Sequence, residues 1–142
     1  MYNLKFQTAL ADKIGLDLDI VRDIFENESE NEFDAALILI EKYKIDSAII
    51  GKIWASHIGF AYVDPNTSIV NQEYIQKAGI KFILDNKALP LYKFGRAITV
   101  STPNPTNPFL QDKMEKKLED LVSLVFCFPF DIEKYLKKNN LQ

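Results

Sequence analysis

The sequence predicts an α+β protein, with a helical subdomain over residues 1–60 and a small α/β subdomain over residues 61–142. Apolar residues recur at helical spacing through the first sixty positions, whereas β-branched, strand-like segments begin at residue 88. The chain has 142 residues, 47% of them hydrophobic, which is enough for one compact domain or two small packed subdomains. We therefore expect about four helices, followed by an α/β sandwich with a sheet of about three strands.

Four amphipathic helices are predicted in the first subdomain. Short polar side chains precede the second and fourth, where they can accept hydrogen bonds from unpaired N–H groups of the first turn. Glycines follow the first and fourth, where a left-handed residue can end a helix. A polar, acidic connection over residues 27–32 separates the two helix pairs. The expected boundary residues are Gly15, Asp17 or Asp19, Asp46 or Ser47, and Gly59.

The apolar and capping pattern of residues 16–25 recurs 29 positions later, in residues 45–54. A duplicated helix pair would produce this pattern, because each pair needs the other to bury its apolar face. Chance coincidence of apolar helix caps would produce it too, and both interpretations stay open.

The second subdomain is predicted to alternate helices with strands. Pro103 and Pro105 stop a strand, because proline cannot continue a ladder of hydrogen bonds. Thr106 or Asn107 can then cap a helix with Pro108 at its first position. The expected elements are an extended link over 62–67, a helix over 71–86, a hairpin over 88–102 turning at Gly95, a helix over 108–120, a buried strand over 121–128 and a helix over 130–138.

Composition excludes several classes of function. The net charge of −3, with acidic and basic residues interspersed, argues against a nucleic-acid surface. The longest apolar run, residues 35–40, is too short to cross a bilayer, and the first residues lack the apolar stretch of a secretion signal. The single cysteine cannot form an internal disulfide and fits a reducing cytoplasm. We expect a cytoplasmic protein without direct membrane insertion.

No motif indicates catalysis, a cofactor or a metal. The five glycines are scattered and do not form a phosphate-binding loop. His57 has no nearby partners at metal-ligand spacing and is expected to donate to a backbone carbonyl at a helix end. Cys127 lies in an apolar segment and is expected to be a small core residue. The chain is therefore predicted to be non-enzymatic, and the acidic clusters are interpreted as solvated helix faces.

Residues 88–109, ALPLYKFGRAITVSTPNPTNPF, resemble the "LPL…G…LTVA…DPTN" segment in the amino-terminal domain of type II secretion and type IV pilus-assembly ATPases. Residues 58–65 resemble the link "LGLPFVDL" of that family, and residues 131–136 resemble its closing acidic helix. The resemblance covers residues 32–138.

The resemblance implies a non-catalytic docking and regulatory domain. Its partners would be inner-membrane platform or cytoplasmic adaptor proteins, and ATP and Mg²⁺ would bind only in a catalytic domain outside this chain. Trp54 is interpreted either as a core residue or as an interface anchor. The candidate docking residues are Trp54, His57, Phe60, Phe109 and Lys113.

Some members of the family bind cyclic di-GMP through tandem motifs that begin with Arg-Leu-Gly. Alignment of the second motif places Asp34 at the arginine and Ala35-Ala36 at the next two positions. Tyr43 then replaces a glycine, and His57 replaces a glutamine. Because a carboxylate repels phosphate, we expect that cyclic di-GMP is not a partner of this chain. The alternative is a nucleotide second-messenger sensor that uses a different geometry.

Overall fold

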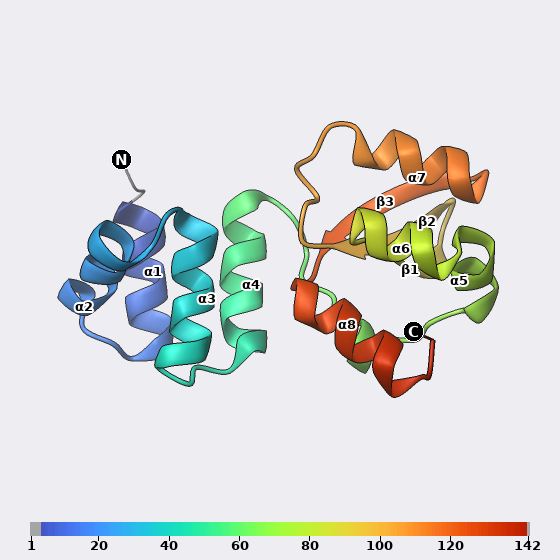
Figure 1. Ribbon diagram of the computed structural model, residues 1–142. Helices are drawn as coiled ribbons and strands as arrows, with labels where there is room; N and C mark the ends of the chain where they lie inside the picture. The colour runs from blue at the N-terminus through green and yellow to red at the C-terminus, as the bar shows by residue number, and fades with distance from the viewer. Residues whose placement is uncertain (1–3, 142) are drawn as a thin grey trace. The chain divides into compact units, whose positions relative to one another are not determined.

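Helices come first and a three-stranded sheet follows in the computed structural model, which describes residues 4–141 (Figure 1). Eight α-helices and three strands occur in that range, which confirms the predicted α+β class. The chain divides into two units, Met1–Gly59 and Phe60–Gln142, called here the helical unit and the sheet unit.

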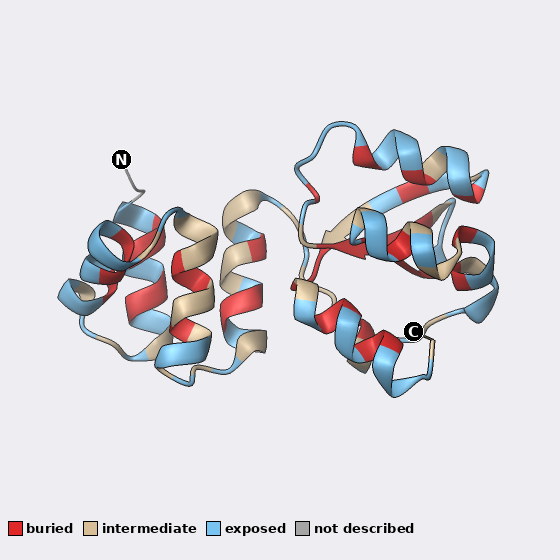
Figure 2. Ribbon diagram, viewed as in Figure 1, coloured by how far each residue is buried: buried red, intermediate tan, exposed pale blue. Residues whose placement is uncertain are grey.

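Each helix of the helical unit has buried positions on one side and exposed positions on the other (Figure 2). Asp17 and Asp46 cap α2 and α4 in the same way, each accepting a hydrogen bond from the backbone N–H two residues later, at 2.9 and 3.0 Å. Gly59 ends α4 with a φ of 86°, as the sequence predicts. The elements are α1 (Leu4–Ile14), α2 (Leu18–Asp23) with a π-helical continuation (Ile24–Glu28), α3 (Glu32–Lys42) and α4 (Ser47–Ile58).

The sheet unit has the strand order β1-β2-β3. The pair β1–β2 is an antiparallel hairpin, whereas β2 and β3 run parallel, with α7 in the crossover that parallel strands require. α5 packs against β1, and α7 packs against β3. The elements are a 3-10 turn (Pro65–Thr67), α5 (Gln72–Ala78), α6 (Ile80–Asn86), β1 (Leu89–Phe94), β2 (Ala97–Thr102), α7 (Leu110–Leu118), β3 (Leu121–Phe126) and α8 (Pro129–Lys138).

The prediction of one continuous helix over residues 71–86 is wrong. Gly79 has φ 86° and ψ 143°, which lies outside the right-handed helical region, so the segment forms the two helices α5 and α6. The helix predicted from Pro108 begins at Leu110 instead. Asn107 accepts a hydrogen bond from the N–H of Phe109 at 3.0 Å, which forms a turn before the helix starts.

The last strand is shorter and less buried than predicted. It ends at Phe126, because the N–H of Phe128 bonds to the Asp131 carboxylate at 2.9 Å and Pro129 starts α8. Leu121 is 56% exposed, and only Val122 and Phe126 of the six strand residues are buried, although the sequence of the strand is nearly all apolar. The link predicted as extended contains the 3-10 turn and an isolated parallel bridge from Tyr62 to Phe126.

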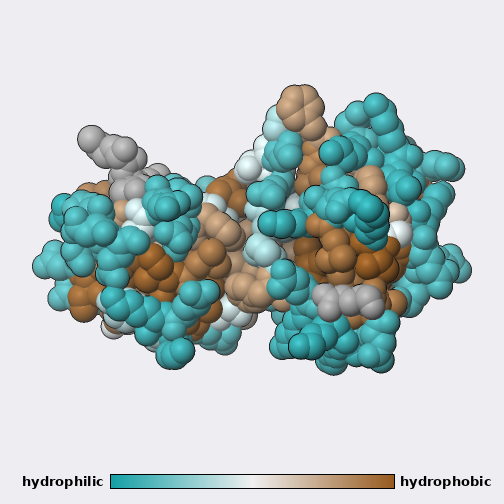
Figure 3. Space-filling model, viewed as in Figure 1, coloured by the Kyte–Doolittle hydropathy of each residue, from teal (hydrophilic) through white to brown (hydrophobic). Residues whose placement is uncertain are grey.

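The surface of both units is mostly hydrophilic on the face that Figure 3 shows, with apolar surface between the polar residues in separate areas. Between residues 4 and 141, no helix has the length and apolar character needed to cross a membrane.

Candidate functional site

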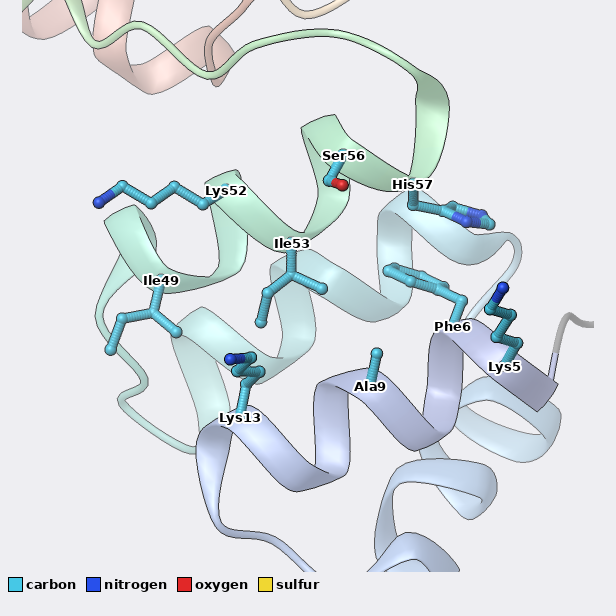
Figure 4. Close-up of a pocket in the computed structure, with 9 residues that line it drawn as sticks. All are labelled: Lys5, Phe6, Ala9, Lys13, Ile49, Lys52, Ile53, Ser56 and His57. Atoms are coloured by element: carbon cyan, nitrogen blue, oxygen red, sulfur yellow. The ribbon is translucent and has the colours of Figure 1, made fainter.

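A hollow of about 880 Å³ lies between α1 and α4 of the helical unit (Figure 4). α1 and α4 pack against each other, and every lining residue comes from one of these two helices. The lining residues are Lys5, Phe6, Ala9, Lys13, Ile49, Lys52, Ile53, Ser56 and His57.

The spacing of the lining residues follows from helix geometry. Lys5, Ala9 and Lys13 are four residues apart and therefore lie on one face of α1. The residues from α4 recur at intervals of three and four, which places them on the face opposite α1. Phe6 is buried and Ile49 is 43% exposed, so the hollow combines an apolar inner surface with an open side.

The electrostatics of the hollow favour an anion. Three lysines line it, and no aspartate or glutamate among residues 4–141 does. Lys13 and Lys52 form no ion pair with any residue between 4 and 141, so their charge is not neutralised by a described neighbour. In Figure 4, Lys13 lies near Ile49 and Ile53, whereas Lys5 lies beside Phe6 near the other end. Positive side chains around an apolar surface suit a ligand with both negative charge and aromatic area.

An aromatic cluster forms one end of the hollow. The ring of His57 stacks on Phe6 with centroids 4.0 Å apart and an interplanar angle of 6°. The centroid of the Trp54 ring lies 5.6 Å from the centroids of both of these rings and 5.6 Å from that of Phe33. The Nε2 atom of His57 lies 3.2 Å from Oε1 of Glu32, so a carboxylate and not the expected backbone carbonyl faces this nitrogen.

Trp54 is half-buried, and its indole N–H is buried with no hydrogen-bond partner among the described residues. Because the chain contains a single tryptophan, its fluorescence reports specifically on this cluster. Trp54 and His57 therefore lie together beside the hollow, whereas Phe60, which is half-buried, opens the sheet unit.

Phe109 and Lys113, the other two candidate docking residues, come together in the sheet unit. Both line a smaller hollow of about 350 Å³, together with Asp85, Lys87, Leu110 and three asparagines. Phe109 is 75% exposed at the start of α7, and Lys113 is exposed one turn later.

A buried carboxyl group anchors α8. Asp131 is 4% exposed, and its Oδ2 accepts hydrogen bonds from the Phe128 N–H at 2.9 Å and the Tyr62 hydroxyl at 3.4 Å. Burial raises the pKa of Asp131 from 3.8 to about 6. The hydrogen bond from the Phe128 N–H lowers this pKa, whereas the negative charge of the nearby Asp64 raises it further. Burial also raises the pKa of the Cys127 thiol, which keeps it protonated. This cluster has a structural role, since it holds the first turn of α8 in place.

The lysine-lined hollow was not predicted from the sequence. The four-residue spacing of Lys5, Ala9 and Lys13 in the sequence indicates that these residues share one face of a helix. The residues of α4 that line the other side of the hollow could be identified only from the packing of α1 against α4. Between residues 4 and 141, no three histidine, cysteine, aspartate or glutamate side chains are grouped so as to hold a metal ion.

Comparison with known proteins connects the chain to one family. The model of the MshEN domain matches residues 58–141. Among solved structures, one described as "Structure of MshE with cdg" matches with a TM-score of 0.64 and 11% sequence identity, covering 97% of this chain and 99% of that chain. No curated protein matches the chain.

The structural match contradicts the expectation about cyclic di-GMP. MshE has the same fold along nearly its whole compared length, and its structure contains cdg, which is cyclic di-GMP. The expectation depended on aligning the second motif over residues 34–57, where Asp34 replaces an arginine, and on the preceding part of the chain offering no better match, with Gly15 as its only glycine and Arg22 inside a helix. That alignment did not consider the lysines of α1 and α4, which supply positive charge at a different place in the same unit.

Proposed function

This chain belongs to the MshEN domain family, the amino-terminal domains of type II secretion and type IV pilus ATPases, and we propose that it is a sensor module that binds cyclic di-GMP. The proposed binding site is the hollow between α1 and α4. The observation that carries the proposal is that Lys13 and Lys52, which form no ion pair with any residue between 4 and 141, line a hollow to which no described carboxylate contributes.

The chemistry of the ligand matches the hollow in two respects. Cyclic di-GMP has two phosphodiester groups, which carry negative charge at neutral pH, and two flat purines. The lysine ammonium groups would pair with the phosphates as point charges. The purines would pack on the apolar side chains of Ile49 and Ile53 and near the stacked rings of Phe6 and His57.

The size of the hollow supports the same ligand class. Small-molecule sites have volumes of roughly 300–1,000 Å³, mostly apolar linings and a few polar groups that fix orientation. The hollow of about 880 Å³ falls within that range, and its open side would admit a ligand directly from solvent. In this proposal the MshEN domain responds to the messenger, while ATP and Mg²⁺ bind in the catalytic domain of such an ATPase.

Titration of the protein with cyclic di-GMP, followed by tryptophan fluorescence, tests the proposal. Trp54 contacts two lining rings, so occupation of the hollow is expected to change its emission. The double substitution Lys13→Gln and Lys52→Gln is expected to weaken binding strongly. The substitution Lys42→Gln is the matched control, because Lys42 belongs to the same unit but pairs with Glu28 at 2.7 Å and does not line the hollow.

A saturable response that the double substitution weakens and the control does not would support the proposal. A fluorescence change without saturation, or binding that both variants retain unchanged, would contradict it. Calorimetry under the same conditions measures the stoichiometry, which is expected to be one ligand per chain because one hollow is proposed.

Docking of partner proteins is a second candidate function. Phe109 is three-quarters exposed beside Lys113, with Lys87 in the same hollow of the sheet unit. The same hollow contains Asp85, whose carboxylate pairs with Lys81 at 2.7 Å. An exposed aromatic ring with two lysines in the same hollow suits a partner segment that combines an apolar side chain with acidic residues. The partner would be an inner-membrane platform or cytoplasmic adaptor protein. Loss of binding to such a protein on Phe109→Ser and Lys113→Glu, with cyclic di-GMP binding intact, would support this function.

A further inference from the structure

The described lining of the hollow between α1 and α4 offers no side chain of the kind that distinguishes one purine from another. Guanine is distinguished from adenine by bidentate pairs with arginine, or by carboxylate and amide groups that accept from its N1–H and N2–H. Among residues 4–141, no arginine, asparagine, glutamine, aspartate or glutamate lines the hollow.

The polar groups that do line the hollow discriminate weakly. Ser56 has a hydroxyl group, which can donate to or accept from either purine. The Nε2 atom of His57 faces the Glu32 carboxylate at 3.2 Å and is therefore occupied by a protein partner. The lysine ammonium groups are flexible point charges, best suited to phosphate oxygens, which every cyclic dinucleotide carries in the same number.

The apolar part of the lining is also indifferent to the base. Ile49, Ile53 and the edge of the stacked Phe6–His57 pair offer contact area and no hydrogen bonds. Stacking on such surfaces tolerates any base, because every base has a π-face.

We infer that the site selects the class of cyclic purine dinucleotides by charge and shape, and that it accepts cyclic di-AMP nearly as well as cyclic di-GMP. The inference rests on the proposed function, since it concerns the same hollow. It assigns recognition to the phosphates, so affinity for both ligands is expected to depend on Lys13 and Lys52 and to fall together as salt screens those charges.

Parallel titrations with cyclic di-GMP and cyclic di-AMP test the inference, using Trp54 fluorescence and calorimetry at low and physiological salt. The two dissociation constants are expected to lie within about tenfold of each other, because no described side chain in the lining offers a bidentate base contact. The double variant Lys13→Gln and Lys52→Gln is expected to weaken both ligands by the same factor. Lys42→Gln again serves as the control for loss of a lysine charge outside the hollow; it removes one charge, so it is compared with each of the single variants Lys13→Gln and Lys52→Gln as well as with the double variant.

The outcomes separate the inference from the proposed function. A preference for cyclic di-GMP greater than about tenfold would overturn the inference and leave the proposed function intact, since it would require a base-reading contact. Failure of both nucleotides to bind would overturn the proposed function, and the inference with it. Binding of cyclic di-AMP alone would also overturn both.

Discussion

Replacement of Asp131 by asparagine tests how burial acts on the carboxyl group that anchors α8. The side chain is 4% exposed, and burial raises its pKa from 3.8 to about 6. Asparagine keeps an oxygen that can accept the Phe128 N–H, but it cannot ionise. The variant therefore removes the titration while it leaves the helix cap nearly unchanged.

The sign of the effect follows from proton binding. Between pH 3.8 and about 6, the folded protein holds this proton more tightly than the unfolded chain does. Folding stability from this group is thus fully present at low pH and is lost as the pH rises through about 6. A shift of about two pKa units corresponds to about 3 kcal/mol, at about 1.36 kcal/mol for each unit. The unfolding free energy of Asp131→Asn, relative to the wild type, should rise by up to that amount between about pH 4 and pH 7.

Urea denaturation followed by circular dichroism measures this difference at each pH. Tryptophan fluorescence is unsuitable, because Trp54 belongs to the other unit. The control is Asp120→Asn, since Asp120 pairs with Lys93 at 2.8 Å and that hydrogen bond lowers its pKa from 3.8. The stability from this pair is lost only as the pH falls below about 4, so Asp120→Asn is expected to differ from the wild type by a nearly constant amount between about pH 4 and pH 7. A difference between Asp131→Asn and the wild type that is constant with pH, or that decreases as the pH rises, would refute the reasoning.

Three further substitutions test the fold through the free energy of unfolding in urea. Gly79→Ala should lower the free energy of unfolding by about 2 kcal/mol, because a φ of 86° with a ψ of 143° is adopted almost only by glycine. The cost comes from the backbone alone, since a Cβ at this position would meet no atom within 4 Å. An unchanged free energy of unfolding would show that Gly79 does not enforce the break between α5 and α6. The unfolding free energy of Trp54→Phe should stay within about 1 kcal/mol of the wild type. The variant loses contact area, but it also removes a buried indole N–H that has no hydrogen-bond partner among the described residues. A loss of several kcal/mol would mean that this N–H does form a hydrogen bond. Phe109→Ser should change stability by less than about 0.5 kcal/mol, because the ring is 75% exposed; a larger loss would indicate that the ring packs within the fold.

The fold class and most element types could be predicted, because they depend on local signals. Asp17 and Asp46 cap helices through hydrogen bonds to N–H groups two residues away, and Gly59 ends α4 through its own backbone conformation. Each of these features is decided within a few residues, so the pattern of the sequence is sufficient.

Other features depend on the tertiary structure and could not be predicted. An interior glycine lowers the stability of a helix by about 1 kcal/mol, which does not by itself decide whether the helix continues through Gly79 or breaks there. The exposure of Leu121 follows from the position of β3 in the sheet, and its local apolar pattern gives no sign of it.

The candidate site could be predicted only in part for the same reason. His57 and Trp54 were selected individually, and they do lie beside the hollow. The lysines of α1 and α4 are separated by about forty positions, so only the packing of the two helices brings Lys13 and Lys52 to the same hollow.

The most direct test of the account is an NMR titration of the 16.3 kDa protein with cyclic di-GMP, in which the amide shifts locate the ligand. The account predicts that the shifts that change belong to the lining of the hollow on α1 and α4, and that Trp54, which contacts two lining residues, responds with them. Shifts confined to residues 60–142, or a spectrum unchanged at saturating ligand, would contradict it.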